Sequence, residues 1–193
     1  MCLPDQISPE PLRLFIAIPL PEEIKIALEN VQRELRHAAP KEGLRWTTRD
    51  QLHLTLRFLG NVQTQHVDAL TQALRSASET YSALELRSQG LGAFPNRGAP
   101  RVLWAAIEDK TKQLPSLQAA IQSATLVFTN EKPEERFAGH ITLARVKRIK
   151  PSEAKVLAAA LGARGSRVFG EWTAREVHLC AANSLRRGRN IPS

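Results

Sequence analysis

The chain has 193 residues, of which 42% are hydrophobic, and it carries a formal net charge of +8 with an isoelectric point near 10.1. No apolar run approaches the ~20 residues that a membrane-spanning helix needs, and the first residues lack the basic start and apolar block of a signal peptide. The two cysteines, Cys2 and Cys180, make no disulfide framework, so we expect a protein of the reducing cytoplasm.

The predicted elements alternate between strands and helices. Residues 12–20, LRLFIAIPL, are rich in β-branched and aromatic side chains and end at two prolines, which is typical of a strand. Residues 21–38 begin with proline, carry acidic residues in the first turn and keep apolar residues at helical spacing, which predicts an amphipathic helix. Similar patterns predict strands at 44–47, 52–60, 81–94, 101–109 and 140–148, helices at 63–80, 112–128 and 151–163, one or two strands in 166–184, and a basic tail at 185–193.

This order of elements predicts an α+β fold made of two similar halves. Each half places one short strand that begins with histidine beside a helix. The sequence contains no low-complexity linker and no sharp change in composition. We therefore expect one domain over residues 12–193, preceded by a disordered lead at residues 1–11.

The two histidine strands repeat one short pattern. Residues from His53 read His-Leu-Thr-Leu, and residues from His140 read His-Ile-Thr-Leu. Because side chains alternate along a strand, His53 and Thr55 face one way and the apolar residues face the other, and the same holds for His140 and Thr142. If a pseudo-two-fold axis relates the halves, two imidazoles and two hydroxyls surround one cleft.

Such a set of side chains suits phosphodiester chemistry. Imidazole has an unperturbed pKa of about 6.5, so one histidine can be neutral and the other protonated at working pH. The neutral imidazole takes a proton from the attacking water, and the protonated one gives a proton to the departing ribose oxygen. The hydroxyls of Thr55 and Thr142 donate hydrogen bonds to the phosphate oxygens as negative charge builds.

The histidines also have less specific interpretations. Zinc could join the two motif histidines to His178 or Asp50, but no cysteine or carboxylate lies at ligand spacing, so no metal is expected. His37 and His66 fall on solvated helix faces, and His178 is expected to have a structural or rim role. A lone His-x-Thr is usually ordinary structure, whereas two copies, each followed by an arginine, favour catalysis.

In this context the sequence resembles the 2H phosphoesterases, which are named for two His-x-Thr motifs. Within them it is similar to the bacterial and archaeal RNA 2′,3′-cyclic phosphodiesterases, first called 2′-5′ RNA ligases. The likeness extends over about residues 13–184, and the stretches that carry it are RLFIAIPLP, LHLTLRFLG, FPNRGAPRVLWAAI and RFAGHITLARV.

The resemblance implies a bilobal fold in which mainly antiparallel sheets line a central cleft and helices lie outside. It implies metal-free hydrolysis of a 2′,3′-cyclic phosphate to a 2′-phosphate, without a cofactor, and a weak reverse reaction that joins such an end to a 5′-hydroxyl. The partner would be an RNA with a cyclic phosphate end, for example a tRNA fragment. The protein would act as a monomer, away from membranes.

The motif residues take their roles from the resemblance. His53 is assigned as the proton donor to O3′ and His140 as the proton acceptor, while Thr55 and Thr142 hold the phosphate. Arg145 matches the arginine that follows the second motif and is assigned to the phosphate as well.

Four further residues are candidates for contact with the substrate. Arg136 and Phe137 stand just before the second motif and are assigned to holding the substrate. Trp46 and Phe58 are candidate stacking or wall residues, with core packing favoured for Phe58.

Two rival functions are compatible with the sequence. A related enzyme could act on another ester, such as ADP-ribose cyclic phosphate or a 2′-5′-linked oligonucleotide, because the motifs contact phosphate and not the nucleoside. A non-catalytic RNA-binding module would use the basic surface, but it would also need exposed aromatic residues for base stacking. Aromatic residues make up only 5% of the chain, which disfavours that module.

Overall fold

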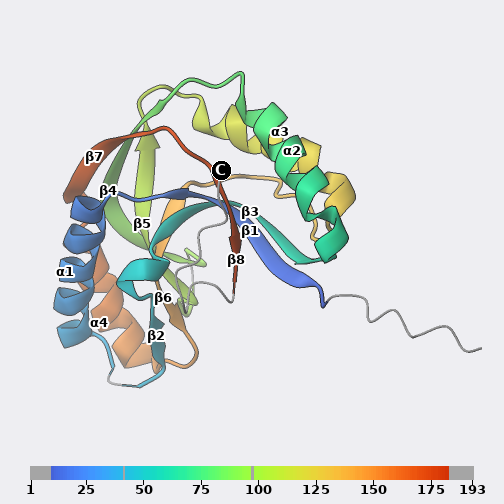
Figure 1. The fold of residues 1–193 in the computed structure, drawn as a ribbon. Coiled ribbons are helices and arrows are strands. Elements are labelled where there is room, and N and C mark those ends of the chain that lie inside the picture. The colour runs from blue at the N-terminus through green and yellow to red at the C-terminus, as the bar shows by residue number, and fades with distance from the viewer. Residues whose placement is uncertain (1–9, 41, 97, 183–193) are drawn as a thin grey trace, which may run out of the picture.

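The structure is a computed structural model that describes residues 10–40, 42–96 and 98–182. Its helices lie outside a strongly curved antiparallel sheet (Figure 1), which confirms the expected α+β class. The first strand begins at Leu12, at the expected boundary. Most of the predicted lead, residues 1–9, and the whole basic tail at 185–193 lie outside the described residues.

The elements follow the predicted order closely. The strands are β1 (Leu12–Pro19), β2 (Leu44–Trp46), β3 (His53–Val62), β4 (Leu84–Phe94), β5 (Val102–Asp109), β6 (His140–Val146), β7 (Val168–Ala174) and β8 (His178–Ala181). The α-helices are α1 (Glu22–Ala38), α2 (Val67–Ser78), α3 (Leu114–Thr125) and α4 (Pro151–Gly162). Several boundaries differ from the predicted ones by two to four residues, and the predicted end of β3 is wrong, because the strand continues through Gly60, where a φ of 64° bends it while it still pairs with β1.

Helix α1 shows why these segments fold as predicted. Its apolar positions Ile24, Leu28, Val31 and Leu35 are at most 3% exposed and form one buried stripe, while acidic residues occupy its first turn. Burial of that stripe against the sheet supplies most of the stability of such a helix. Within the part of the chain that the structure describes, no helix is long and apolar enough to span a bilayer.

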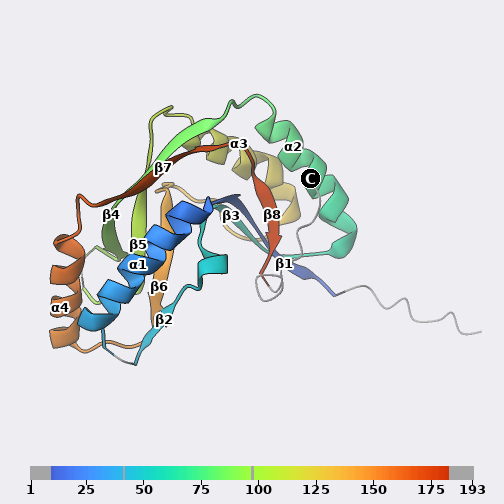
Figure 2. The same ribbon diagram turned by 60° about the vertical axis from the view of Figure 1, so that its left-hand side comes forward.

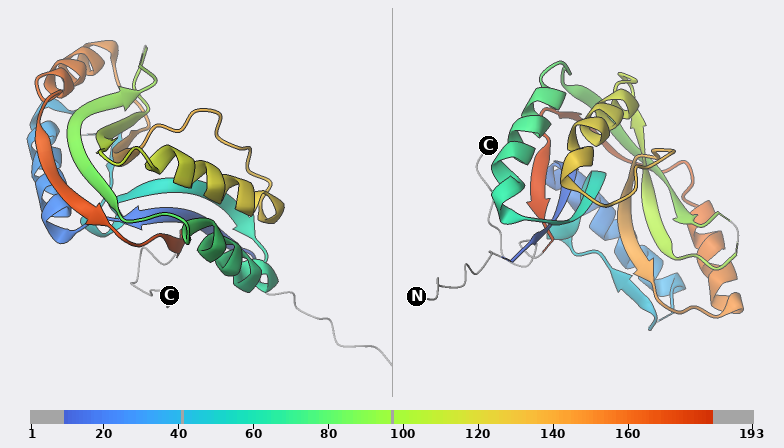
Figure 3. Two further views of the ribbon diagram at one scale, coloured as in Figure 1. Left: turned by 90° about the horizontal axis from the view of Figure 1, so that it is seen from above. Right: turned by 90° about the vertical axis from the view of Figure 1, so that its right-hand side faces the viewer.

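All eight strands belong to one sheet, in the order β7-β4-β5-β6-β3-β1-β8, with β2 paired to β6. Helices α1 and α4 pack together outside the β7–β4 end, and α2 and α3 pack together beside β3 (Figures 2 and 3). The two lobes therefore do not follow chain order. Strands β1 and β3 join the last strand β8 in one lobe, while α1 and β2 belong to the other.

The two histidine strands cross where the lobes meet. Strands β3 and β6 run antiparallel, and the pair that defines their register is Leu54 and Ile141, both fully buried. Ile18 of β1 lies opposite Leu54, and Ala105 of β5 lies opposite Ile141, so the buried row continues across four strands. This row fixes the positions of both motifs relative to each other.

Each histidine strand carries a bulge three residues after its histidine. In β3, Leu56 has no partner of its own on β1, and in β6, Leu143 has none on β5. A buried glutamine amide reaches each bulge from the helix behind it. Gln32 of α1 donates to the carbonyl of Leu143 at 2.8 Å, and Gln118 of α3 donates to that of Leu56 at 3.3 Å. Both lobes therefore contain a bulge whose carbonyl accepts a hydrogen bond from a buried glutamine, a feature that was not predicted from the sequence.

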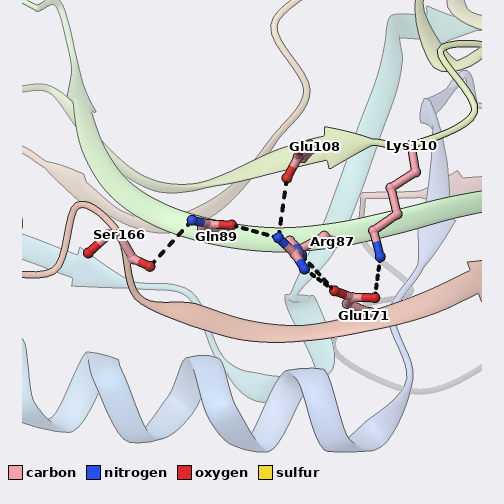
Figure 4. Close-up of polar contacts among 6 residues, drawn as sticks. All are labelled: Arg87, Gln89, Glu108, Lys110, Ser166 and Glu171. Carbon is pink, nitrogen blue, oxygen red and sulfur yellow. Dashed lines mark hydrogen bonds and ion pairs between the residues drawn. The ribbon is translucent and has the colours of Figure 1, made fainter.

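Ion pairs tie the outer edge of the sheet together (Figure 4). Arg87 of β4 donates to Glu171 of β7 at 2.6 Å and lies 3.8 Å from Glu108 of β5. Lys110 also pairs with Glu171, and hydrogen bonds from Lys110 and Arg87 hold the pKa of Glu171 below its usual value. The basic residues at this edge are therefore neutralised by neighbouring carboxylates.

Replacement of Gln32 by leucine should destabilise the fold. Gln32 is 2% exposed, and its amide also donates to the carbonyl of Thr47 at 2.8 Å, so the variant removes one hydrogen bond from each carbonyl, although the Leu143 carbonyl still accepts from the backbone N–H of Thr47 at 2.9 Å. We expect the free energy of unfolding to fall by about 1–3 kcal/mol, measured by urea denaturation. Gln72→Leu on the exposed face of α2 is the matched control and should change it by less than about 0.5 kcal/mol. Equal stability of Gln32→Leu and the wild type would contradict this account.

Candidate active site

The crossing of β3 and β6 brings the four motif side chains to one face. On either side of Leu54 and Ile141, the neighbouring side chains turn to the opposite, concave face of the sheet. The antiparallel ladder therefore sets His53 and Thr55 of one strand beside Thr142 and His140 of the other. All four are partly exposed, whereas the apolar residues that alternate with them are buried.

A hydrogen bond to the main chain orients each of the two imidazoles. The Nδ1 atom of His140 lies 2.7 Å from the carbonyl oxygen of Ala138. His53 makes the corresponding hydrogen bond to the backbone of Gln51, again two residues before the histidine. A carbonyl only accepts, so Nδ1 of His140 carries the proton and Nε2 is left free for proton transfer.

A phenylalanine packs on each of the two rings. Phe15 of β1 stacks on His53 with ring centroids 4.8 Å apart, and Phe94 of β4 meets His140 edge-on at 5.3 Å. Burial lowers the pKa of His53, the hydrogen bond to Gln51 raises it, and the nearby positive charge of Arg145 lowers it further. The net shift is downward, which favours the neutral form of His53 in the free site.

Arg57 fastens the segment that leads into the second motif. Its side chain is on β3, is only 4% exposed, and donates to Gln122 Oε1 at 2.9 Å and to the carbonyls of Glu131 and Lys132 at 3.0 and 3.1 Å. In the sequence it stands out only as the arginine that accompanies the first motif. The structure shows that it anchors the 129–139 loop and is not free to bind phosphate.

Glu134 places a carboxylate near the second motif. Its backbone N–H donates to Gln122 Oε1 at 2.7 Å, so the same glutamine holds both Glu134 and Arg57. Burial raises the pKa of Glu134, while the electrostatic interactions with His140 and Arg57 oppose that rise. This residue was not identified from the sequence, because nothing in the segment TNEKPEERFAG singles it out.

A cavity of about 600 Å³ opens beside His140. Phe137, a predicted substrate-binding residue, lines it together with Phe94 and Trp104, and Lys112 adds a positive charge to its wall. Arg136 is exposed and is not among the described residues that line this cavity. The volume and the aromatic walls suit an organic ligand next to the reacting centre.

Arg145, which the resemblance assigns to the phosphate, lies close to the candidate site. It is exposed on β6, opposite Arg45 of β2, and its charge is one cause of the lowered pKa of His53. The bulge at Leu143 explains this position, because simple alternation from His140 would turn residue 145 toward the helices. The structure also places Arg45 on the same face, a position that was not predicted from the sequence.

The structure gives no support to Trp46 as a substrate-binding residue. Trp46 lies opposite the fully buried Ala144 and packs against the core, with the Arg36 guanidinium 4.7 Å from its ring centroid. It is therefore on the helix side of the sheet.

Core packing, the interpretation favoured for Phe58, is wrong. Phe58 is 55% exposed and its ring lies 6.3 Å from Phe15. The bulge at Leu56 is the reason, since it turns Arg57 inward and Phe58 toward the concave face.

His178 lies at the rim of the same face. It pairs with Ala17 of β1, which pairs in turn with Thr55, and its Nε2 lies 2.9 Å from Glu176 Oε2. Over the described ranges of the chain, no group of three or more His, Cys, Asp or Glu is arranged to hold a metal ion.

Known proteins share both this sequence and this fold. Residues 18–104, which contain the first motif, match the family of LigT-like phosphoesterases. The RNA 2′,3′-cyclic phosphodiesterase of Thermus thermophilus is 33% identical over 153 residues, which cover 76% of this chain and 74% of that protein. The enzyme of the same name from Archaeoglobus fulgidus is 29% identical over 171 residues, covering 87% and 89%.

Solved structures extend the similarity over both motifs. TT0787 of Thermus thermophilus superposes with a TM-score of 0.69 and 30% identity, covering 87% of each chain. E. coli LigT complexed with 3′-AMP superposes with a TM-score of 0.67 and 26% identity, covering 89% of this chain and 88% of that one. The chain therefore belongs to the 2H phosphoesterases, in the LigT-like family of the RNA 2′,3′-cyclic phosphodiesterases.

Proposed function

We propose that this chain hydrolyses the 2′,3′-cyclic phosphate at the end of an RNA to a 2′-phosphate, with His53 and His140 as acid and base and without a metal ion. The observation that carries the proposal is the crossing of β3 and β6, which sets both imidazoles and both threonine hydroxyls on one face. The names of the relatives support the substrate, and the 3′-AMP bound to E. coli LigT supports a nucleotide in this fold.

His140 is suited to the role of the base. Its Nδ1–H is held by the carbonyl of Ala138, so Nε2 of the neutral ring has a free lone pair. Nε2 takes a proton from water as the water oxygen attacks phosphorus. The bond between phosphorus and O3′ breaks, and the hydroxyls of Thr55 and Thr142 donate to the non-bridging oxygens as they gain charge.

His53 acts as the acid once the substrate is bound. Burial and Arg145 favour its neutral form in the free site, but a phosphate anion placed beside it favours the protonated form. Protonation of His53 is therefore coupled to substrate binding. The imidazolium then gives its proton to O3′, which leaves the phosphate on O2′.

The same site would also catalyse a weak ligation. A 5′-hydroxyl that occupies the position of the attacking water would form a 2′-5′ linkage, with the two histidines in the same roles. Water at bulk concentration keeps hydrolysis dominant. Ligation therefore follows from the mechanism and requires no additional catalytic group.

Loss of either motif histidine should nearly abolish turnover. We expect His53→Ala and His140→Ala each to lower kcat by about 10²- to 10⁴-fold on a cyclic-phosphate-ended RNA. Thr55→Ala and Thr142→Ala should lower it by about 10- to 100-fold, since each removes one donor among several. His37→Ala, on an exposed position of α1, is the control and should keep the wild-type rate. A folded His53→Ala or His140→Ala protein with near wild-type kcat would refute the role of that strand.

Removal of the Arg145 charge should raise the pKa of His53. Arg145 disfavours the imidazolium by like-charge repulsion, so Arg145→Ala stabilises the protonated ring and moves its titration to higher pH. The measurement is an NMR titration of the histidine Cε1–H signals in the free protein, with His53 assigned from the His53→Ala spectrum. An unchanged or lower pKa of His53 in Arg145→Ala would mean that the two groups do not interact.

The identity of the product tests the proposed function most sharply. A single orientation of the cyclic phosphate between acid and base gives one isomer, the 2′-phosphate. The product of a cyclic-ended RNA should therefore resist a phosphatase specific for 3′-phosphates and remain sensitive to a general phosphatase. EDTA should leave the rate unchanged. Release of a 3′-phosphate or of both isomers, or inhibition by EDTA that added metal reverses, would contradict the proposal.

A further inference from the structure

Five exposed basic residues gather at the end of the cleft where β2 pairs with β6. Arg45 lies opposite Arg145, and Val102, which follows Arg101, is the partner of Arg145 on the other side. The backbone N–H groups of Lys147 and Arg148 both donate to the carbonyl of Gly43, which draws the end of β6 toward β2. We call this group the cationic rim; its members are Arg45, Arg101, Arg145, Lys147 and Arg148.

The side chains of the cationic rim have no protein partner among the residues that the structure describes: none forms an ion pair or a hydrogen bond. Segments 42–46, 101–104 and 144–148 contain one acidic residue, Glu42, and it forms no ion pair with them. The outer edge of the sheet is different, because Arg87 and Lys110 there are paired with Glu171 (Figure 4).

The cationic rim begins at the reacting centre and leads away from it. Arg145 lies on β6, three residues after Thr142, and β6 pairs with β3; its charge also lowers the pKa of His53, so this end of the rim is next to the two motifs. Lys147 follows the last residue of β6, is exposed, and lies beside the start of β2, because its backbone N–H donates to the carbonyl of Gly43 at 2.7 Å. Alternate residues of a strand are about 6.6 Å apart, close to the spacing of successive phosphates in an extended RNA strand.

We infer that the cationic rim binds the phosphates of the RNA chain on the 5′ side of the cyclic end, which makes a polynucleotide the preferred substrate. This inference rests on the proposed function. An RNA that ends in a 2′,3′-cyclic phosphate can continue only through the 5′ oxygen of its last nucleotide. Arg145 lies nearest the reacting phosphate, and Arg45 and Lys147 meet the phosphates that follow. A cyclic mononucleotide cannot use those two contacts.

The test compares two substrates, adenosine 2′,3′-cyclic phosphate and a pentanucleotide with the same cyclic end. The variant is Arg45→Ala/Lys147→Ala, which leaves Arg145 in place. The wild type should show a higher kcat/KM for the pentanucleotide than for the mononucleotide. In the variant, the ratio of these two kcat/KM values should be about tenfold lower. In the wild type, log kcat/KM for the pentanucleotide should fall with log salt, and the variant's slope should be shallower by about 1.4, since each lost single-strand phosphate contact removes about 0.7.

A charge-matched control variant distinguishes the effect of losing the rim cations from the effect of lowering the net charge of the protein. Arg75→Ala/Lys155→Ala removes two exposed cations on α2 and α4 and should leave the pentanucleotide advantage and the salt slope at wild-type values. An equal loss in this control, an unchanged advantage in the rim variant, or a wild type without any chain-length advantage would overturn the inference. In each case turnover of the mononucleotide still upholds the proposed function, whereas a wild type that hydrolyses neither substrate contradicts the proposed function itself.

Discussion

The buried pair Leu54 and Ile141 is the contact on which the candidate site depends. It joins two strands that come from different parts of the chain, and both side chains are fully buried. A slip of one residue by either strand would turn its histidine and its threonine toward the helices and expose its apolar residues in the cleft. The cost of exposing those apolar side chains therefore fixes the geometry of the candidate site, and the same two short motifs specify both the core packing and the polar side chains of the cleft.

Matched bulges extend this register control to the residues around the motifs. At Leu56 and Leu143 each strand gains one residue, and the alternation of side chains changes phase. The change brings Phe58 and Arg145, each five residues after its histidine, to the concave face. The buried amides of Gln32 and Gln118 donate hydrogen bonds to the bulge carbonyls, and the Leu143 carbonyl also accepts from the backbone N–H of Thr47, so the desolvation of these carbonyls is compensated. The pseudo-symmetry of the fold is thus clearest in its irregular positions.

The sequence predicted the elements and the four motif residues because hydrophobic periodicity and a repeated motif are local signals. It could not predict the bulges, since an extra residue in one strand is defined only by its partner. The errors follow from that gap: Phe58 was expected in the core, and Arg57 could not be recognised as an internal anchor. Gln32 is a polar residue on a helix and gives no sign in the sequence that it is 2% exposed. The sequence also could not predict that α1 packs in the other lobe from β1 and β3, because tertiary contacts decide which lobe a helix joins.

Positive charge near the cleft affects both His53 and the binding of an anion. Burial and the charge of Arg145 lower the pKa of His53 and favour its neutral form in the free site, and the exposed cations at one end of the cleft favour the approach of an anion. The central claim is that both motifs act on one phosphate, and a crystal structure with a uridine 2′,3′-cyclic vanadate tests it most directly. We predict that vanadium sits over the crossing of β3 and β6, with His53 and His140 hydrogen-bonded to opposite apical oxygens and Thr55 and Thr142 to equatorial ones. Vanadate held by only one of the two motifs, or bound away from the crossing, would contradict the claim.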